Sequence, residues 1–238
     1  MPAQNLADRE WQAAVWGNYD SNQEFLRRVA AVFKRGSAIL EIGCGKGMLL
    51  NSLQKLGHNV TGIDVDAGAI EACRASFPDV DAQVGSGDLL AFPTESFDAV
   101  LSFDVFEHIR DSDCHLREVK RVLKPDGVYL LQTPNKWTNV PFEILRYWHK
   151  YRMGPVAGYR ELLKEHCSLH NYWELRRRFA RNGFKTTFVN IPVVNEYFTL
   201  KMHTYFGLAA SPLLAVFNPD RSPTPLRTNF YLKAELVH

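Results

Sequence analysis

The chain is poor in cysteine, in net charge and in long apolar runs, and each shortage argues against a class of protein. Its four cysteines lie far apart without a C-x-x-C pair, which disfavours a disulfide framework or a zinc site and indicates a reducing compartment. The net charge of +2 gives little attraction for nucleic acid. No run of about 18 apolar residues is present, and the first residues lack the apolar core of a secretory signal. We therefore expect a cytoplasmic protein without a membrane span.

The remaining composition, with 46% hydrophobic and 23% charged residues in 238, is that of an ordinary globular domain. This length suits one large domain, or one domain with an insertion, and can bury a full core. Strand and helix patterns alternate from residue 37 onward. Strands are predicted at 37–42, 59–64, 80–85, 97–103 and 127–133, and helices at 46–56, 67–76 and 111–122. This alternation predicts an α/β fold, a doubly wound and mostly parallel sheet with helices on both faces.

Residues 39–47 begin as a buried strand and end as a turn with three glycines, Gly43, Gly45 and Gly47. Glycine permits positive φ and lets a ligand lie directly against the backbone. In a doubly wound sheet, ligands bind at the carboxyl ends of the strands, where this turn is expected. Asp64 ends the next predicted strand, 21 residues after Gly43, close to the spacing of an acid that binds ribose hydroxyls. The turn therefore predicts a nucleoside ligand.

Two residues of the turn distinguish between nucleoside ligands. A dinucleotide-binding fingerprint needs a third glycine at position 48, which is occupied by Met48. Glu41 lies two residues before the first glycine, where its carboxylate would repel a pyrophosphate and attract an amino group. The turn therefore argues against NAD and predicts S-adenosylmethionine (SAM), which carries both a ribose and a cationic amine.

Residues 41–47, Glu-Ile-Gly-Cys-Gly-Lys-Gly, resemble motif I of the class I SAM-dependent methyltransferases. Later motifs of that family are similar, in the same order, to residues 92–98, 103–109 and 123–127. The small-molecule subgroup that includes the ubiquinone and menaquinone biosynthesis methyltransferases is the most similar. The resemblance is strong over residues 37–133 and weak over 165–190. It implies SAM as methyl donor and S-adenosylhomocysteine as product.

The resemblance also implies a Rossmann-like, seven-stranded sheet whose antiparallel last strand, residues 229–236, lies beside residues 184–191. Further helices are expected from Pro141 and over residues 165–183. We expect four parts: an N-terminal helical cap at 1–36, the SAM-binding core at 37–135, an aromatic and basic helical insertion at 136–165, and the rest of the core at 166–238 with an apolar insertion at about 192–226.

The predicted cofactor residues come from the turn and from the resemblance. At the turn and the next strand they are Glu41, Gly43, Cys44, Gly45, Asp64 and Val65, with the Asp64 carboxylate expected to hold both ribose hydroxyls and Val65 to flank the adenine. The resemblance adds positions at the adenine edge and beside the methionine part of SAM, namely Asp88, Leu89, Ser102 and Phe103. No metal is expected.

His108 is the candidate catalytic base. It follows the strand at 97–103, and in parts of the resembling subgroup the matching histidine faces the substrate. A histidine can accept a proton from a hydroxyl near neutral pH. The alternative interpretation is that His108 packs the following loop. His166 and His170, on the helix expected over 165–183, are the other candidates for the base.

The two predicted insertions are rich in aromatic residues, which favours a small, apolar or aromatic acceptor. We expect methylation at oxygen rather than at carbon or nitrogen. These residues are Trp137, Phe142, Tyr147, Trp148, Tyr151, Tyr197, Phe198, Tyr205, Phe206 and Phe217. Residues 136–152 mix basic and aromatic side chains, as interfacial helices do, so peripheral membrane contact with a quinone-type acceptor is an alternative. Packing in a homodimer and a non-catalytic SAM-binding role also stay open. A nucleic-acid substrate is disfavoured by the low charge.

Overall fold

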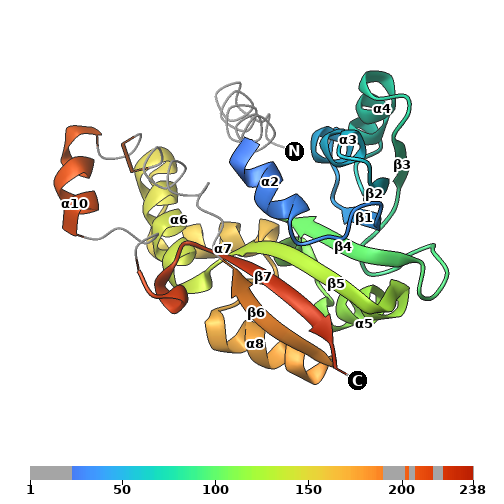
Figure 1. Cartoon of the computed structure of the whole chain (residues 1–238). Coiled ribbons are helices and arrows are strands. Elements are labelled where there is room, and N and C mark those ends of the chain that lie inside the picture. The colour runs from blue at the N-terminus through green and yellow to red at the C-terminus, as the bar shows by residue number, and fades with distance from the viewer. Residues whose placement is uncertain (1–22, 190–201, 204–206, 217–221, 238) are drawn as a thin grey trace.

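The computed structural model describes residues 23–189, 202–203, 207–216 and 222–237. Seven strands form one sheet in the order β3-β2-β1-β4-β5-β7-β6 (Figure 1). The strands are β1 (Ala38–Ile42), β2 (Asn59–Asp64), β3 (Asp81–Val84), β4 (Phe97–Phe103), β5 (Leu123–Pro134), β6 (Phe184–Val189) and β7 (Asn229–Leu236). Strands β1 to β5 pair in parallel, and β7 runs antiparallel to both β5 and β6. The predicted fold class and the antiparallel last strand are confirmed.

Helices cover both faces of the sheet (Figure 1). On one face lie α2 (Gln23–Ala30), α3 (Met48–Lys55) and α4 (Ala67–Ser76), and on the other lie α5 (Ser112–Val122) and α8 (Tyr172–Arg181). Successive residues of β1 belong to opposite layers: Ile39 packs with the α3 side and Leu40 with the α5 side. A central parallel strand is buried on both faces, which explains why Ile39, Leu40 and Ile42 are all apolar.

The strand order reverses at β1, which is flanked by β2 on one side and β4 on the other. In open α/β sheets such a reversal opens a crevice at the carboxyl ends of the strands, and ligands bind there. The turn after β1, the acid at the end of β2 and the residues after β4 therefore converge on one edge of the sheet.

Two boundaries differ from the prediction by more than two residues, each for a local reason. Strand β5 begins at Leu123 rather than at residue 127, because Leu123 already pairs with Phe97 before the register of β4 and β5 shifts. The helix expected from Pro141 is α6 (Lys136–Tyr151) and contains that proline. It begins earlier because the Asn135 side chain accepts a hydrogen bond from the Trp137 N–H and caps the helix.

The continuous helix expected over residues 165–183 is wrong. Helix α7 (Pro155–Glu165) ends before it, and α8 begins after a capping box formed by Asn171 and Glu174. The segment between them, residues 166–171, instead follows the sheet edge, where the His170 carbonyl accepts the Lys136 N–H at 3.0 Å. His166 and His170 therefore lie in a loop and not on a helix.

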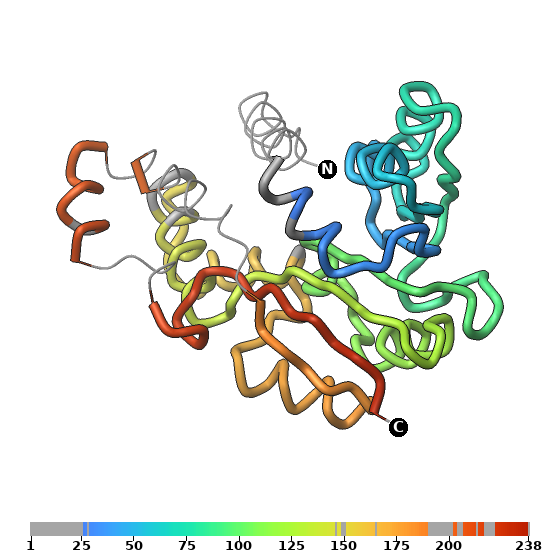
Figure 2. The backbone as a smooth tube through the Cα atoms, in the orientation of Figure 1, coloured from blue at the N-terminus to red at the C-terminus, as the bar shows by residue number. Residues whose placement is uncertain are grey.

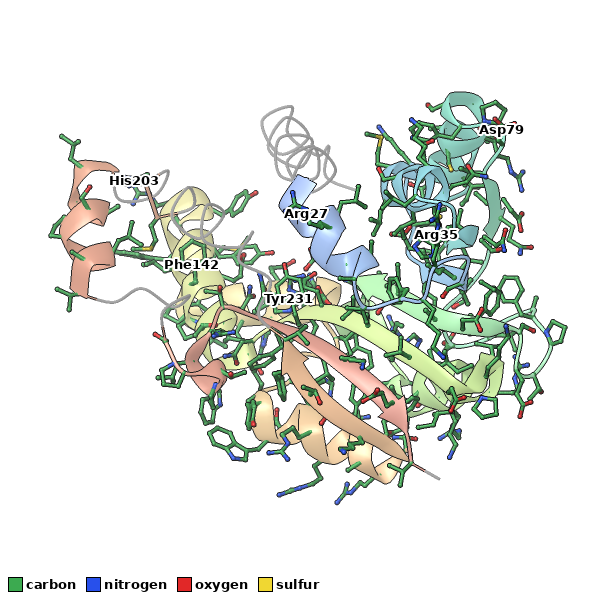
Figure 3. All side chains as sticks on the ribbon, viewed as in Figure 1. Arg27, Arg35, Asp79, Phe142, His203 and Tyr231 are labelled. Carbon is green, nitrogen blue, oxygen red and sulfur yellow. The ribbon has the colours of Figure 1, made fainter. Side chains whose placement is uncertain are left out.

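The insertions are described in part. The backbone trace carries α6 and α10 (Ala210–Val216) to the side of the molecule opposite α3 and α4 (Figure 2). Phe142 of α6 and Tyr231 of β7 lie on the α2 side of the sheet (Figure 3). The short turns η2 (Gly207–Ala209) and η4 (Thr224–Leu226) complete this region. Five predicted aromatic residues and most of the cap at 1–36 lie outside the described residues; the aromatics are Tyr197, Phe198, Tyr205, Phe206 and Phe217.

Candidate active site

The turn after β1 contains three glycines in a conformation that other residues rarely adopt. Gly43, Gly45 and Gly47 have φ values of +76°, +52° and +79°, a left-handed region that favours glycine. A Cβ at Gly43 would lie 2.2 Å from Val105 Cγ2, and one at Gly47 would lie 2.2 Å from Cys73 Sγ. Both glycines are therefore required by close packing as well as by their backbone conformation.

Gly45 differs from its two neighbours because it faces open space. A Cβ there would meet no described atom within 4 Å. The Gly45 N–H donates to Asp64 Oδ2 at 2.9 Å, and the Asp66 N–H donates to Asp64 Oδ1 at 2.9 Å. The turn and the second strand thus fix the Asp64 carboxylate beside a bare stretch of backbone. This open cradle beside an oriented acid fits the ribose end of a SAM molecule.

Glu41 and Cys44 line the buried side of the same turn. Glu41 is only 5% exposed although it carries a carboxylate, which is unusual at a strand end. Burial raises the pKa of the Cys44 thiol well above its usual range, and the carboxylates of Glu41 and Asp64 raise it further. The Cys44 N–H is already bonded to the Ile63 carbonyl at 3.0 Å. Cys44 is therefore a neutral thiol and not a nucleophile, and it can reach a ligand only through other backbone atoms.

The adenine-edge residues lie at the ends of the next strands. Val65 and Leu89 are 74% and 76% exposed, a high exposure for two apolar side chains on the same edge of the sheet. Apolar surfaces of this kind are suited to cover the faces of a flat ring. Asp88 is half-buried and accepts a short hydrogen bond from the Ser86 hydroxyl. It lies within a tight turn closed by a β-bridge between Ser86 and Leu89.

Ser102 and Phe103 face away from each other at the end of β4. Ser102 is fully buried, and its hydroxyl lies 2.6 Å from the Tyr129 hydroxyl on the α5 side of the sheet. Phe103 packs into the opposite layer with the residues of α3. The Ser102 side chain thus belongs to the protein interior, which leaves its backbone as the part that can reach a ligand.

The residues after β4 form a turn that is held by hydrogen bonds to the Gln132 side chain. Asp104 has φ +51°; its N–H donates to Gln132 Oε1 at 2.9 Å, and Gln132 Nε2 donates to its carboxylate at 2.7 Å. The chain then enters η1 (Phe106–His108), which places Glu107 inside and His108 outside. Burial and the nearby charge of Asp104 raise the pKa of Glu107 well above its ordinary value, while Thr133 Oγ1 donates to Glu107 Oε2 at 3.0 Å.

Of the three candidate bases, two lie together. The ring of His108 is exposed, and its centroid is 4.9 Å from that of His166. His170 is buried instead, with its ring centroid 5.5 Å from that of Phe106. Burial and the charge of Arg178 lower the pKa of His170 to about 4. His108 and His166 therefore lie next to each other at the sheet edge, whereas His170 lies in the protein interior.

Glu107, His108 and His166 also form a set of metal-ligand atoms. Across the described part of the chain, these three residues each offer one such atom, and the atoms lie within 4.8 Å of one another. Two imidazoles and one carboxylate suit a divalent transition metal. No metal is expected from the sequence, so a chelator belongs in any test of His108.

His115 is a site-supporting residue that the sequence analysis did not single out. It is fully buried on α5; its Nδ1 lies 2.7 Å from the Gly87 carbonyl and its Nε2 lies 2.8 Å from the Tyr129 hydroxyl. Through Tyr129 it reaches Ser102, so one chain of hydrogen bonds connects the loop after β3 to the end of β4. The only signal in the sequence was a histidine on the apolar face of the predicted helix at 111–122.

This network predicts a pH-dependent stability. Burial lowers the pKa of His115 from 6.5 to about 4, so the unfolded chain binds its proton at a higher pH than the folded chain does. Stability is therefore lost as pH falls from 6.5 toward 4, and the loss for one such group at pH 5 is about 2 kcal/mol. Between pH 7.5 and 5, urea titrations should show the free energy of unfolding falling by that much more in wild type than in His115→Gln. Parallel profiles would contradict this, and His203→Gln, at an exposed position, should follow wild type.

The fold and the site geometry define a class I, Rossmann-like methyltransferase. The family model described as a methyltransferase domain matches residues 15–188. Because this is more than half of the chain, the protein belongs to that family. Within the described residues, no helix combines the length and apolarity needed to cross a bilayer.

Curated relatives and a solved structure are consistent with this family. The chain is 36% identical over 123 residues to a probable S-adenosylmethionine-dependent methyltransferase of Mycolicibacterium smegmatis, covering 49% of this chain and 48% of the relative. It is 39% identical over 106 residues to the ubiquinone biosynthesis O-methyltransferase of Xanthomonas oryzae pv. oryzae, covering 42% and 44%. The chain thus spans about half the length of the curated relatives it matches. The structure of a geranyl diphosphate methyltransferase in complex with SAM has a TM-score of 0.64 at 16% identity, covers 100% of this chain and 93% of its own, and shows the shared fold.

Proposed function

We propose that the protein transfers a methyl group from SAM to a hydroxyl of a small, apolar or aromatic acceptor. The observation that carries the proposal is the open cradle at Gly45, whose N–H holds the Asp64 carboxylate at 2.9 Å. The hydroxyl acceptor is supported by the name of the Xanthomonas relative, an O-methyltransferase of ubiquinone biosynthesis. The apolar acceptor is supported by the half-exposed Trp137 and Trp148 of α6.

Ten residues are proposed to hold SAM, and they are Glu41, Gly43, Cys44, Gly45, Asp64, Val65, Asp88, Leu89, Ser102 and Phe103. When bound, SAM supplies a methyl group already activated on a positive sulfur. The chain's own residues then have three tasks: to orient the acceptor, to exclude water and to take the hydroxyl proton. Orientation alone can contribute about 7–11 kcal/mol to the lowering of the barrier.

The reaction is tested with methyl-labelled SAM and paired acceptors, an ortho-diphenol and its dimethyl ether, each in buffer. A polyprenylated phenol in lipid vesicles is added because Trp148, Tyr151 and Tyr159 leave aromatic surface exposed on α6 and α7. Label in the diphenol and none in the ether supports O-methylation. Product formed only in vesicles supports a peripheral membrane enzyme instead. Bound SAM without product from any acceptor supports a non-catalytic SAM-binding protein.

His108 is proposed to take the hydroxyl proton. A His108→Ala variant is expected to lose about 100-fold in kcat, the order of magnitude of general-base catalysis, while its KM for SAM stays within threefold of wild type. His166→Ala is the matched variant, because it removes a ring only 4.9 Å away and leaves the His108 side chain present. Steady-state kinetics with and without EDTA check the assignment. Full activity in His108→Ala, or loss of wild-type activity on chelation, would contradict a histidine base acting without a metal.

A further inference from the structure

A cavity of about 430 Å³ lies on the α5 and α8 side of the molecule. It is enclosed by the start of α5, the start of α6, the loop at 166–171 and one face of α8. None of the residues proposed to bind SAM lines it. Its volume lies within the range of about 300–1,000 Å³ that small-molecule sites occupy.

Cationic side chains dominate the lining of this cavity. They come from three separate segments of the chain and are Arg110, Lys136, Arg177, Arg178 and Arg181. Two acids face them: Asp113 pairs with Arg178 at 2.9 Å, and Glu174 pairs with Lys136 at 3.4 Å. Lys136 and Arg178 are thereby neutralised within the protein.

Three arginines remain after these pairs are formed. Within the described ranges, Arg110, Arg177 and Arg181 have neither an ion pair nor a hydrogen bond. All three side chains are exposed, so solvent screens their mutual repulsion, which is strongest at low salt. Guanidinium groups match the geometry of phosphate oxygens and bind them bidentately, so a dianion would remove the repulsion and form strong hydrogen bonds.

The floor of the cavity adds uncharged donors. His170 is 7% exposed, lines the cavity, and its Nδ1 has no hydrogen-bond partner among the described residues. The hydroxyls of Ser112 and Ser168 are buried beside it and bond to each other. A buried polar atom without a partner is costly, and a ligand oxygen would satisfy it. The pKa of His170, lowered to about 4, keeps its ring neutral near pH 7, where one ring nitrogen carries a proton to donate.

We infer that this cavity is a binding site for a phosphate group, carried by a small phosphorylated molecule and separate from the SAM site. The three free arginines bind the phosphate oxygens, and His170 contacts it from the floor. The remaining volume holds the rest of the ligand. The site stands apart from the proposed methyl transfer, since it uses none of the same residues.

The test compares anions at constant ionic strength. Inorganic phosphate and glucose 6-phosphate should raise the melting temperature of the wild-type protein, and sodium chloride at the same ionic strength should not. Vesicles containing phosphatidic acid distinguish a soluble ligand from a lipid headgroup, because only the latter would sediment the protein. SAM affinity, measured by calorimetry, should be the same with and without phosphate if the two sites are separate.

Two charge reversals on one helix give the decisive comparison. Arg177→Glu, inside the cavity, should lower phosphate affinity at least tenfold, whereas Arg176→Glu, on the same helix but outside the cavity lining, should leave it unchanged. Arg177→Ala should also raise the melting temperature of the unliganded protein at low salt, because it relieves repulsion, while abolishing the response to phosphate. A wild-type response equal to that of chloride, or an equal loss in both charge-reversal variants, would overturn the inference. If Arg177→Glu fails to fold, the Arg177→Ala response decides alone.

Discussion

Asp64→Ala is expected to bind SAM about 100-fold more weakly than the wild-type protein. The carboxylate accepts hydrogen bonds from the backbone of Gly45 and Asp66, both at 2.9 Å, and is proposed to hold the ribose hydroxyls as well. A hydrogen bond to a charged group contributes about 1.5–3 kcal/mol net of water, so the loss of two ribose contacts at the low end of this range gives roughly 3 kcal/mol. Calorimetric titration with SAM measures the change directly.

The control removes an acid far from the site. Asp79, near α4 at the far edge of the molecule (Figure 3), should tolerate substitution by alanine with SAM affinity unchanged. A second comparison separates lost ribose contacts from a collapsed turn. The 2′-deoxy analogue of S-adenosylhomocysteine should bind wild type more weakly than the parent compound, and Asp64→Ala should no longer distinguish the two. If Asp64→Ala bound SAM as well as wild type, the proposed cofactor site would be wrong.

The sequence was sufficient for the parts of the fold that repeat a local pattern. Strands β2 and β4 and helix α4 lie at the predicted residues because apolar periodicity and caps such as Asp66 act over a few positions. The glycine turn could also be predicted, since its three glycines alternate in the sequence and all have positive φ. Periodicity, caps and turn glycines of this kind do not depend on distant segments.

What the sequence did not reveal depends on contacts between distant residues. The break before α8 exists because the loop at 166–171 pairs with the residues just after β5, through the Lys136 N–H and the His170 carbonyl. The role of His115 depends on Tyr129, 14 positions later and on another element. The proximity of His108 and His166 likewise arises only once that loop crosses the sheet edge. Each of these features joins residues that no periodic pattern relates.

Gly45→Ala should weaken SAM binding, while its loss of stability should match that of a glycine variant away from the site. At φ +52° an alanine costs about 1–2 kcal/mol in backbone strain, and its methyl group would project into the open cradle. Gly57, at the end of α3, has φ +88° and likewise no described atom within 4 Å of an added Cβ, so Gly57→Ala carries a comparable strain away from the site.

Urea titrations should give similar losses of stability for the two variants. SAM affinity should fall at least tenfold in Gly45→Ala alone, because a ligand lying against that backbone leaves no room for a methyl group. Equal SAM affinities in the two variants would mean that the space beside Gly45 is solvent and that the cofactor lies elsewhere.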